Sequence, residues 1–322
     1  MARLISQYRT PEDASVIVQP KYGFDAAAVL LGAETLLVKS DPITFATDGA
    51  GHYLVAVNAN DIACMGGIPR WLTVVVLLPE GKTTPATVER LFSELREACV
   101  EAGVALIGGH TEITLGVDRP LLVGTMLGVP GPTGLLRPGE ASPGDELYVT
   151  KWIGIEGTAL LGHDCDTDLA ALGENVIERA KLLLRDPGVS VVPDALASLA
   201  SGVVTALHDP TEGGIATAIH ELAEASSLGA LVEHDSIPVR EETRLICDQL
   251  SIDPLGLLSS GALLIAAKPG TGEKLRETLE AASIPVTRIG RLTDIRHGVQ
   301  LIVGDETVPL RRYDSDEITR VL

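Results

Sequence analysis

The chain is poor in aromatic and in basic residues. Aromatic residues make up 3% of its 322 residues, so the core must be built from Ala, Val, Leu and Ile. Lys and Arg together number 25 against 44 Asp and Glu, which gives a formal net charge of −19 at pH 7. Because nucleic-acid binding depends on clustered Lys and Arg, we expect no nucleic-acid partner.

Cysteine is also scarce, and long apolar runs are absent. No two of the four cysteines form a Cys-x-x-Cys pair, so neither a zinc ribbon nor a dithiol redox site is indicated. Thiols spread in this way fit a reducing compartment. The apolar stretch 71–78 is too short to span a bilayer, and residues 1–9 hold no apolar core of a signal peptide. We therefore expect a cytoplasmic protein without a membrane partner.

The length and the distribution of Gly and Pro predict two domains. A chain of 322 residues is long for one core and suits two domains of roughly 150 residues each. The stretch 130–139 is rich in Pro and Gly, as is typical of a linker. We place the boundary there, which gives domains at 1–135 and 136–322.

Apolar patterns predict strands and helices in both halves. In the first half we expect strands at 27–31, 35–38, 43–47, 71–78, 104–107 and 121–129 and helices at 53–65 and 85–102. Thr84 is the expected cap of the second helix, and Gly103 its end. In the second half we expect strands at 146–151, 203–207, 261–267 and 286–292 and helices at 169–184, 194–201, 214–226 and 273–282. This mixture predicts an α/β or α+β fold and leaves the strand order open.

Two segments of the first half place carboxylates where a ligand would bind. Asp48 follows Thr47 at the end of an expected strand and precedes a Gly, although a turn Asp often bonds only its own backbone. Asp61 follows Asn58 and Asn60 within an apolar helix pattern. Burying an unpartnered carboxylate costs several kcal/mol, so either a divalent cation or a Lys or Arg must neutralise Asp61.

Three further segments combine Gly with polar side chains. Gly108-Gly109-His110-Thr111-Glu112 follows an expected strand, where paired glycines let a ligand approach the backbone or simply form a tight turn. His110 has no spaced His or Cys partners for zinc. The segment 208–214 contains Asp209 and ends in Gly213-Gly214 before an expected helix, whose N-terminus favours phosphate or is merely capped by Thr211. Asp25 adds a weaker Gly-x-Asp pattern before the first strand.

Together these segments indicate a hard cation and phosphate. Aspartate oxygens near Gly-rich turns suit Mg²⁺, which prefers carboxylates together with substrate phosphates. Gly81-Lys82-Thr83 looks like the end of a P-loop, but Val76 stands where that loop requires its first Gly. The residues alone therefore predict either a phosphate-handling enzyme or a nucleotide-binding module.

The order of the motifs resembles the aminoimidazole-ribonucleotide (AIR) synthase superfamily, and its HypE-like hydrogenase expression/formation branch above all. The resemblance covers residues 23–291 and rests on Gly-x-Asp-Ala-Ala, Thr-Asp, Asn-Asp-Ile-Ala-x-Met-Gly, Gly-Gly-His-Thr-Glu and Asp-Pro-Thr-x-Gly-Gly. It implies two α/β domains: the N-terminal sheet domain pairs in a homodimer, and ATP with Mg²⁺ binds between that pair and the C-terminal domain.

The resemblance also implies roles for individual residues. It assigns metal binding to Asp25, Asp48, Asp61 and Asp209. It assigns nucleotide binding to Thr47, Asn60, Gly108, Gly109, His110, Thr111 and Glu112, and phosphate binding to Gly213 and Gly214. No general base can be named, because His110 and His208 are equally compatible with structural roles.

The chain departs from each branch of the superfamily at one or more positions. Glu212 stands where the HypE pattern has Arg, the last cysteine is Cys247 rather than a C-terminal carrier thiol, and His110 stands where thiamine-monophosphate kinase has Asp. We expect an ATP- and Mg²⁺-dependent HypE-like enzyme that activates an amide-type oxygen of a small molecule or of another protein. The alternatives are a small-metabolite kinase and a nucleotide-binding assembly module without turnover.

Overall fold

The computed structural model describes residues 13–19, 21, 23–44 and 49–322. The chain divides between residues 135 and 136 into two compact units, each described by itself below. The N-terminal unit holds residues 13–19, 25–44 and 49–135, and the C-terminal unit holds residues 136–322 with Lys21, Gly23 and Phe24. No helix in the described part of the chain has both the length and the apolar character to cross a membrane.

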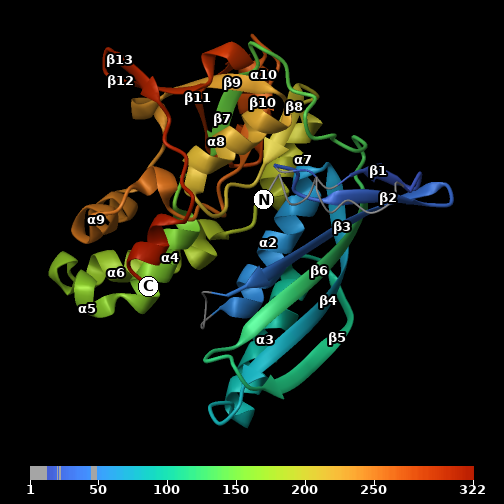
Figure 1. Cartoon of the computed structure of the whole chain (residues 1–322), viewed down its shortest axis with the longest axis vertical. Coiled ribbons are helices and arrows are strands. Elements are labelled where there is room, and N and C mark those ends of the chain that lie inside the picture. The colour runs from blue at the N-terminus through green and yellow to red at the C-terminus, as the bar shows by residue number, and fades with distance from the viewer. Residues whose placement is uncertain (1–12, 20, 22, 45–48) are drawn as a thin grey trace. The chain divides into compact units, whose positions relative to one another are not determined.

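The N-terminal unit is built on a six-stranded sheet with the order β1-β2-β3-β6-β4-β5 (Figure 1). Its strands are β1 (Val16–Val18), β2 (Ala27–Leu31), β3 (Glu34–Ile43), β4 (Gly67–Pro79), β5 (Ala105–Thr114) and β6 (Leu121–Pro130). Only β4 and β5 are parallel neighbours, and the other pairs in this sheet are antiparallel. β3 continues from Glu34 to Ile43, so the first part of the strand expected at 43–47 belongs to the strand expected at 35–38. Residues 45–47 lie outside the described residues.

Two helices pack against this sheet. α2 (Ala50–Cys64) lies between the sheet and α3 (Pro85–Glu101), and it is buried almost all round, as a helix covered on opposite sides must be. α3 buries one face, and its N-terminus is capped as predicted, because the Thr84 side chain accepts the Thr87 N–H at 3.2 Å. At Gly51 a Cβ atom would lie 2.6 Å from the Leu95 nitrogen, so a glycine is needed where the helices meet.

The C-terminal unit is built on a seven-stranded sheet with the order β13-β12-β9-β11-β7-β10-β8. Its strands are β7 (Glu146–Thr150), β8 (Val204–His208), β9 (Leu228–Glu233), β10 (Leu264–Ala267), β11 (Val286–Asp294), β12 (Val299–Val303) and β13 (Glu306–Pro309). β9 and β12 are parallel, and the other neighbours are antiparallel. Both units therefore combine mixed sheets with helices, which confirms the predicted fold class.

Seven α-helices among the described residues complete the C-terminal unit (Figure 1). They are α4 (Ile155–Asp164), α5 (Asp166–Leu169), α6 (Glu174–Leu182), α7 (Val192–Ala200), α8 (Gly214–Ala225), α9 (Glu241–Leu250) and α10 (Gly272–Ala281). α8 packs its apolar face on the sheet, where Ile215, Ile219 and Leu222 join the main core with Leu147 and Ile289. The helix expected at 169–184 is interrupted, because Gly173 has a φ of 83° and ends a short turn before α6 begins.

Each unit contains one of the two tryptophans of the chain. Trp71 lies on β4, opposite Ala105 of β5 and Leu127 of β6. Trp152 follows β7, and the guanidinium carbon of Arg240 lies 4.6 Å from the centre of its ring. This cation–π contact joins the end of β7 to the start of α9.

Candidate functional site

Three aspartates of the N-terminal unit lie around one lysine. Lys39 and Asp41 stand two residues apart on β3, so their side chains point to the same face of the sheet. The Lys39 Nζ lies 3.1 Å from Asp41 Oδ2 and 2.8 Å from Asp61 Oδ2. Asp61 comes from α2, which packs on β3, and its side chain is 5% exposed. The segment predicted to need a counter-charge therefore receives it from Lys39.

Asn58 fixes the position of α2 against this part of β3. Its side chain accepts the Asp41 N–H at 3.0 Å, and its Nδ2 donates to the carbonyl oxygens of Asp41 at 3.4 Å and Leu54 at 2.9 Å. A Cβ atom at Gly124 of β6 would lie 2.8 Å from this Nδ2, so only glycine leaves room for the amide. Because Asp61 follows Asn58 by about one helical turn, this clamp also brings Asp61 to β3.

Asp25 is the third carboxylate of the group. It precedes β2, and the pairing of Ala27 with Val38 brings this end of β2 to the stretch of β3 that carries Lys39. Burial alone would lower the pKa of Lys39, but the carboxylates of Asp61, Asp41 and Asp25 outweigh it and raise the pKa well above its usual value. One ammonium against three carboxylates leaves a formal charge of −2.

This arrangement tests the expected metal site in part. Among the described residues, no three His, Cys, Asp or Glu side chains are grouped so as to hold a metal ion by themselves. Mg²⁺, however, is usually held by one or two carboxylates together with substrate phosphates, so the group around Lys39 fits an ion that arrives with a nucleotide. Thr47 and Asp48 lie outside the described residues, and Asn60 is fully buried in α2.

Sequence reasoning missed Lys39 and Asp41. The Lys-x-Asp spacing within an expected strand places both side chains on one face, and this pattern was the available indication. The partner of Asp61 was not identifiable from sequence, because it comes from another element of the fold.

Residues 108–112 form neither the tight turn that was one of the two alternatives for this segment nor a loop. All five residues lie within β5, which continues to Thr114 because it pairs in parallel with β4 throughout this stretch. Gly109 is needed for this pairing, since a Cβ atom there would lie 1.9 Å from the Val74 carbonyl oxygen. Gly108, His110, Thr111 and Glu112 are exposed, and His110 Nε2 lies 3.2 Å from Glu112 Oε2. The segment is therefore an exposed strand at a sheet edge rather than a loop, and the nucleotide-binding role of its residues stays a prediction.

In the C-terminal unit, the segment 208–214 connects β8 to α8. His208 is 6% exposed, and its Nε2 lies 2.9 Å from Glu221 Oε2 of α8, so this histidine is held within the fold. Asp209 is 2% exposed and follows directly. Gly213 and Gly214 have φ values of 78° and 62°, which a residue with a side chain rarely adopts.

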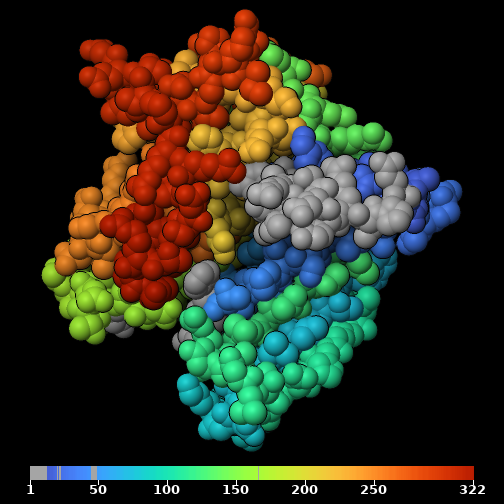
Figure 2. Space-filling view, viewed as in Figure 1, coloured from blue at the N-terminus to red at the C-terminus, as the bar shows by residue number. Residues whose placement is uncertain are grey.

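The turn at Gly213 already has an internal anionic partner. Its buried N–H donates to Asp316 Oδ2 at 2.7 Å, while Asp316 Oδ1 accepts the Ile318 N–H at 2.9 Å. Asp316 precedes the short helix η6 (Glu317–Arg320) near the end of the chain, which Figure 2 shows in dark red at the surface of this unit. The amide expected to face phosphate is therefore occupied by a carboxylate.

A second buried acid lies close to this turn. Glu156 stands in the first turn of α4 and is 5% exposed. Burial raises the pKa of Glu156 to about 7; the Ser260 hydroxyl lowers this pKa, and the carboxylates of Asp316 and Glu212 raise it further. This corner of the C-terminal unit is therefore acidic, and Glu212 adds to that charge.

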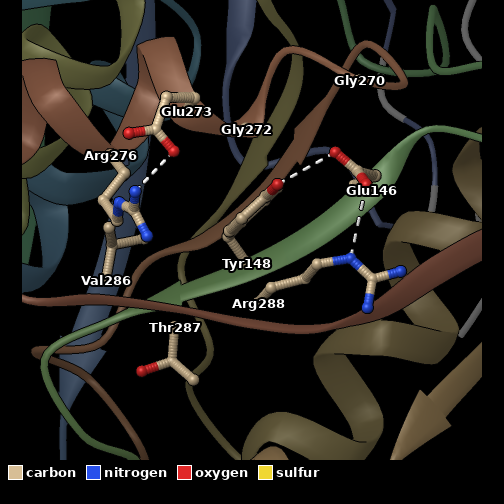
Figure 3. Close-up of a pocket in the computed structure, with 9 residues that line it drawn as sticks. All are labelled: Glu146, Tyr148, Gly270, Gly272, Glu273, Arg276, Val286, Thr287 and Arg288. Carbon is tan, nitrogen blue, oxygen red and sulfur yellow. Dashed lines mark hydrogen bonds and ion pairs between the residues drawn. The ribbon is translucent and has the colours of Figure 1, made fainter.

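A cavity of about 490 Å³ opens elsewhere in the same unit, between β7, β11 and the start of α10. Figure 3 shows Glu146 between Tyr148, whose hydroxyl donates to it at 2.9 Å, and Arg288, whose Nε donates to it at 3.4 Å. Burial and the hydrogen bond to Glu146 raise the pKa of Tyr148 to about 12. Arg276 pairs with Glu273 in the same way. The charges that line the cavity thus neutralise one another, and none of the predicted site residues lies in it.

Both halves of the chain match models of one protein family. Residues 12–130 match the N-terminal domain of AIR synthase related protein, and residues 142–302 match its C-terminal domain. The chain therefore belongs to the AIR synthase-related family, as the order of its motifs predicts.

Within this family the chain is similar to hydrogenase maturation proteins. It is 30% identical to a putative hydrogenase expression/formation protein of Methanocaldococcus jannaschii, over 89% of this chain and 85% of that one. It is 29% identical to carbamoyl dehydratase HypE of Cupriavidus necator, over 87% of this chain and 80% of that one. A solved structure of the hydrogenase maturation protein HypE in complex with ATP matches with a TM-score of 0.71 at 25% identity, over 91% of this chain and 89% of that one. The predicted likeness to the HypE branch is confirmed.

Proposed function

We propose that this protein binds ATP together with Mg²⁺ and uses it to dehydrate a carbamoyl-type amide, as an enzyme similar to HypE. The observation that carries the proposal is the convergence of Asp25, Asp41 and Asp61, from three separate segments, on one place in the N-terminal unit. The chain belongs to the AIR synthase-related family, and its relatives include carbamoyl dehydratases and a HypE solved with ATP.

The charge of this group supports a role in holding a metal–nucleotide pair. Three carboxylates and one ammonium retain a formal charge of −2, which one divalent cation balances. A bound Mg²⁺ would neutralise charge on the triphosphate and align it for attack. Asp25, Asp41 and Asp61 are the residues we assign to this ion. Asp48 and Asp209 remain expected ligands on the resemblance alone.

The proposed reaction couples phosphoryl transfer to loss of the amide oxygen. The carbonyl oxygen attacks the terminal phosphorus of ATP, which forms an oxygen–phosphorus bond and releases ADP. The carbon–oxygen bond then breaks, phosphate leaves with that oxygen, and the amide nitrogen loses both its protons. The balance is amide plus ATP to nitrile, ADP, phosphate and one net proton. Nucleotide binding and alignment supply most of the catalysis in such a transfer.

Nucleotide affinity of Asp61→Asn, measured with and without Mg²⁺, tests the proposal. We expect the variant to lose the Mg²⁺-dependent part of its ATP affinity and to keep its fold, as judged by circular dichroism. Asp118→Asn is the matched control, because Asp118 belongs to the same unit and its side chain is 83% exposed. Unchanged Mg²⁺-dependent affinity in Asp61→Asn would refute the assignment, and the identification of ADP as product would separate turnover from binding alone.

We further propose that the N-terminal unit pairs with a second copy of itself. β5 lies at the edge of the sheet with its free backbone groups unpaired by any described strand on that side. It is exposed along nearly its whole length and presents Leu106, Ile107 and Ile113, which are 44%, 55% and 61% exposed. A long apolar edge strand is a template for pairing with another chain, and natural proteins normally cover it.

The oligomeric state of Ile107→Lys tests this pairing. A charge on the edge strand disfavours strand addition, so light scattering after size exclusion should give half the wild-type mass. Val100→Lys is the control, since Val100 is 70% exposed but lies on α3 rather than on β5. A monomeric wild type, or a dimeric Ile107→Lys, would contradict the proposal.

A further inference from the structure

The ammonium group of Lys39 occupies the centre of the carboxylate group. Its Nζ lies within ion-pair distance of both Asp41 and Asp61, at 3.1 and 2.8 Å, and the Lys39 side chain is 21% exposed. The backbone of Asp41 is held there independently of the lysine, because Asn58 bonds both its N–H and its carbonyl oxygen. The carboxylates therefore converge on a position that a protein cation already fills.

We infer that Lys39 is a resident cation of this site, which takes one cation position among the three aspartates and leaves the divalent ion to enter only with the nucleotide phosphates. A positioning role of this kind differs from that of an ordinary structural ion pair, because the ammonium competes with a metal for the same oxygens. A metal ion and an ammonium cannot share Asp61 Oδ2 at 2.8 Å without strong repulsion.

The charges explain why the ion needs the nucleotide. Without phosphates, the site has a formal charge of −2 and an ammonium at its centre, and Mg²⁺ gives up its water reluctantly. The triphosphate adds negative charge and further oxygen ligands, which offset the repulsion from Lys39. Removing the lysine charge would instead leave the carboxylates of Asp41 and Asp61 without a competing cation, so that Mg²⁺ and its bound waters would associate with them more tightly than in wild type.

Thermal unfolding in the presence of Mg²⁺ alone, without nucleotide, tests the inference. The variants are Lys39→Met, which keeps the length of the side chain, and Lys39→Arg, which keeps its charge. A ligand that binds only the folded state raises the melting temperature according to its concentration relative to Kd. We expect about 10 mM MgCl2 to stabilise Lys39→Met and to leave wild type and Lys39→Arg unchanged, at constant ionic strength.

Isothermal titration calorimetry with MgCl2 measures the same difference between Lys39→Met and wild type as a difference in Mg²⁺ affinity. We expect Lys39→Met to bind Mg²⁺ at least about tenfold more tightly than wild type, a change equivalent to about 1.4 kcal/mol. An equal response of Lys39→Met and wild type overturns the inference, and so does a Lys39→Arg variant that behaves like Lys39→Met. If Lys39→Met folds only when Mg²⁺ is added, this also supports the inference.

If Lys39→Met does not fold at all, a titration of the wild-type protein with MgCl2 tests the inference instead. Wild type should bind Mg²⁺ only weakly in the absence of nucleotide, and a Kd below about 10 mM would overturn the inference. This role of Lys39 rests on the proposed function for the nucleotide, but its test uses Mg²⁺ alone. A failure of ATP to bind would therefore not change the result with the Lys39 variants. Equally, a negative result with the Lys39 variants would not exclude ATP binding.

Discussion

Asn58 holds the backbone of Asp41 through both groups of its side-chain amide, accepting its N–H at 3.0 Å and donating to its carbonyl at 3.4 Å. We expect Asn58→Leu to lower the free energy of unfolding by about 1–3 kcal/mol, because the replacement breaks buried hydrogen bonds without supplying new partners. Urea denaturation measures this loss. Asn175→Leu is the control, since Asn175 is exposed on α6 and its replacement should change stability little. If Asn58→Leu and Asn175→Leu lower the free energy of unfolding equally, the hydrogen bonds between Asn58 and Asp41 contribute nothing to stability.

Adjacent glycines of β5 should differ sharply in their tolerance of a methyl group. A Cβ at Gly109 would lie 1.9 Å from the Val74 carbonyl oxygen, whereas a Cβ at Gly108 would meet nothing within 4 Å. We expect Gly109→Ala to destabilise the N-terminal unit by about 1–3 kcal/mol, as overpacking does, and Gly108→Ala to be nearly neutral. Hydrogen exchange of β4 and β5 amides locates the damage. Similar exchange in the two variants would argue against the parallel pairing.

Asp316 should stabilise the turn that begins α8. Its replacement by Ala leaves the buried Gly213 N–H without its acceptor, which should cost about 1–3 kcal/mol in the free energy of unfolding. The exposed neighbour Asp314, replaced in the same way, is the control.

The same pair of variants tests the phosphate role predicted for Gly213. Asp316→Ala frees the amide for an outside anion, so tighter ATP binding than in Asp314→Ala supports that role. Equal affinity in the two variants contradicts it, and Asp316 is then a structural cap alone.

Glu156 should make stability depend on pH. Its pKa is about 7 in the folded protein against an ordinary value of 4.5, so the folded state retains a proton that the unfolded state has lost. The contribution of Glu156 to the free energy of unfolding therefore falls as pH rises from about 4.5 to 7, and it is constant outside that pH range. At 1.36 kcal/mol per pKa unit, the loss reaches about 3 kcal/mol.

Glu156→Gln removes this dependence while keeping the size of the side chain. Below about pH 4.5 we expect the free energy of unfolding of the variant and that of wild type to change equally with pH. Between that pH and pH 8 the free energy of unfolding of the variant should rise relative to that of wild type by up to about 3 kcal/mol. Glu174→Gln is the control, because Glu174 also lies in the first turn of a helix but is exposed. A pH-independent difference between wild type and Glu156→Gln would contradict the buried acid.

Local sequence patterns were sufficient to predict those helices and strands that capping residues and apolar spacing determine. The cap at Thr84 and the apolar spacing of α3 predict that helix correctly, and the Val-rich run of β4 predicts a buried strand. The demand of Asp61 for a counter-charge was also predictable from its apolar surroundings.

Long-range contacts decided what sequence patterns could not. Gly108-Gly109 suggests a turn by composition, but parallel pairing with β4 extends the strand through it. Lys39 and Asp316 become partners of Asp61 and Gly213 only through tertiary packing, and no local pattern connects them. α9 was not predicted, because its few apolar residues, such as Ile246, are separated by many polar ones.

The separation of the two tryptophans makes each unit visible to fluorescence by itself. Trp71 lies inside a sheet of one unit, and Trp152 lies under a guanidinium group in the other. A Trp152→Phe protein therefore emits only from the nucleotide-binding half proposed here, and a Trp71→Phe protein only from its neighbour. Denaturation of these two proteins would reveal whether the halves melt together or in succession.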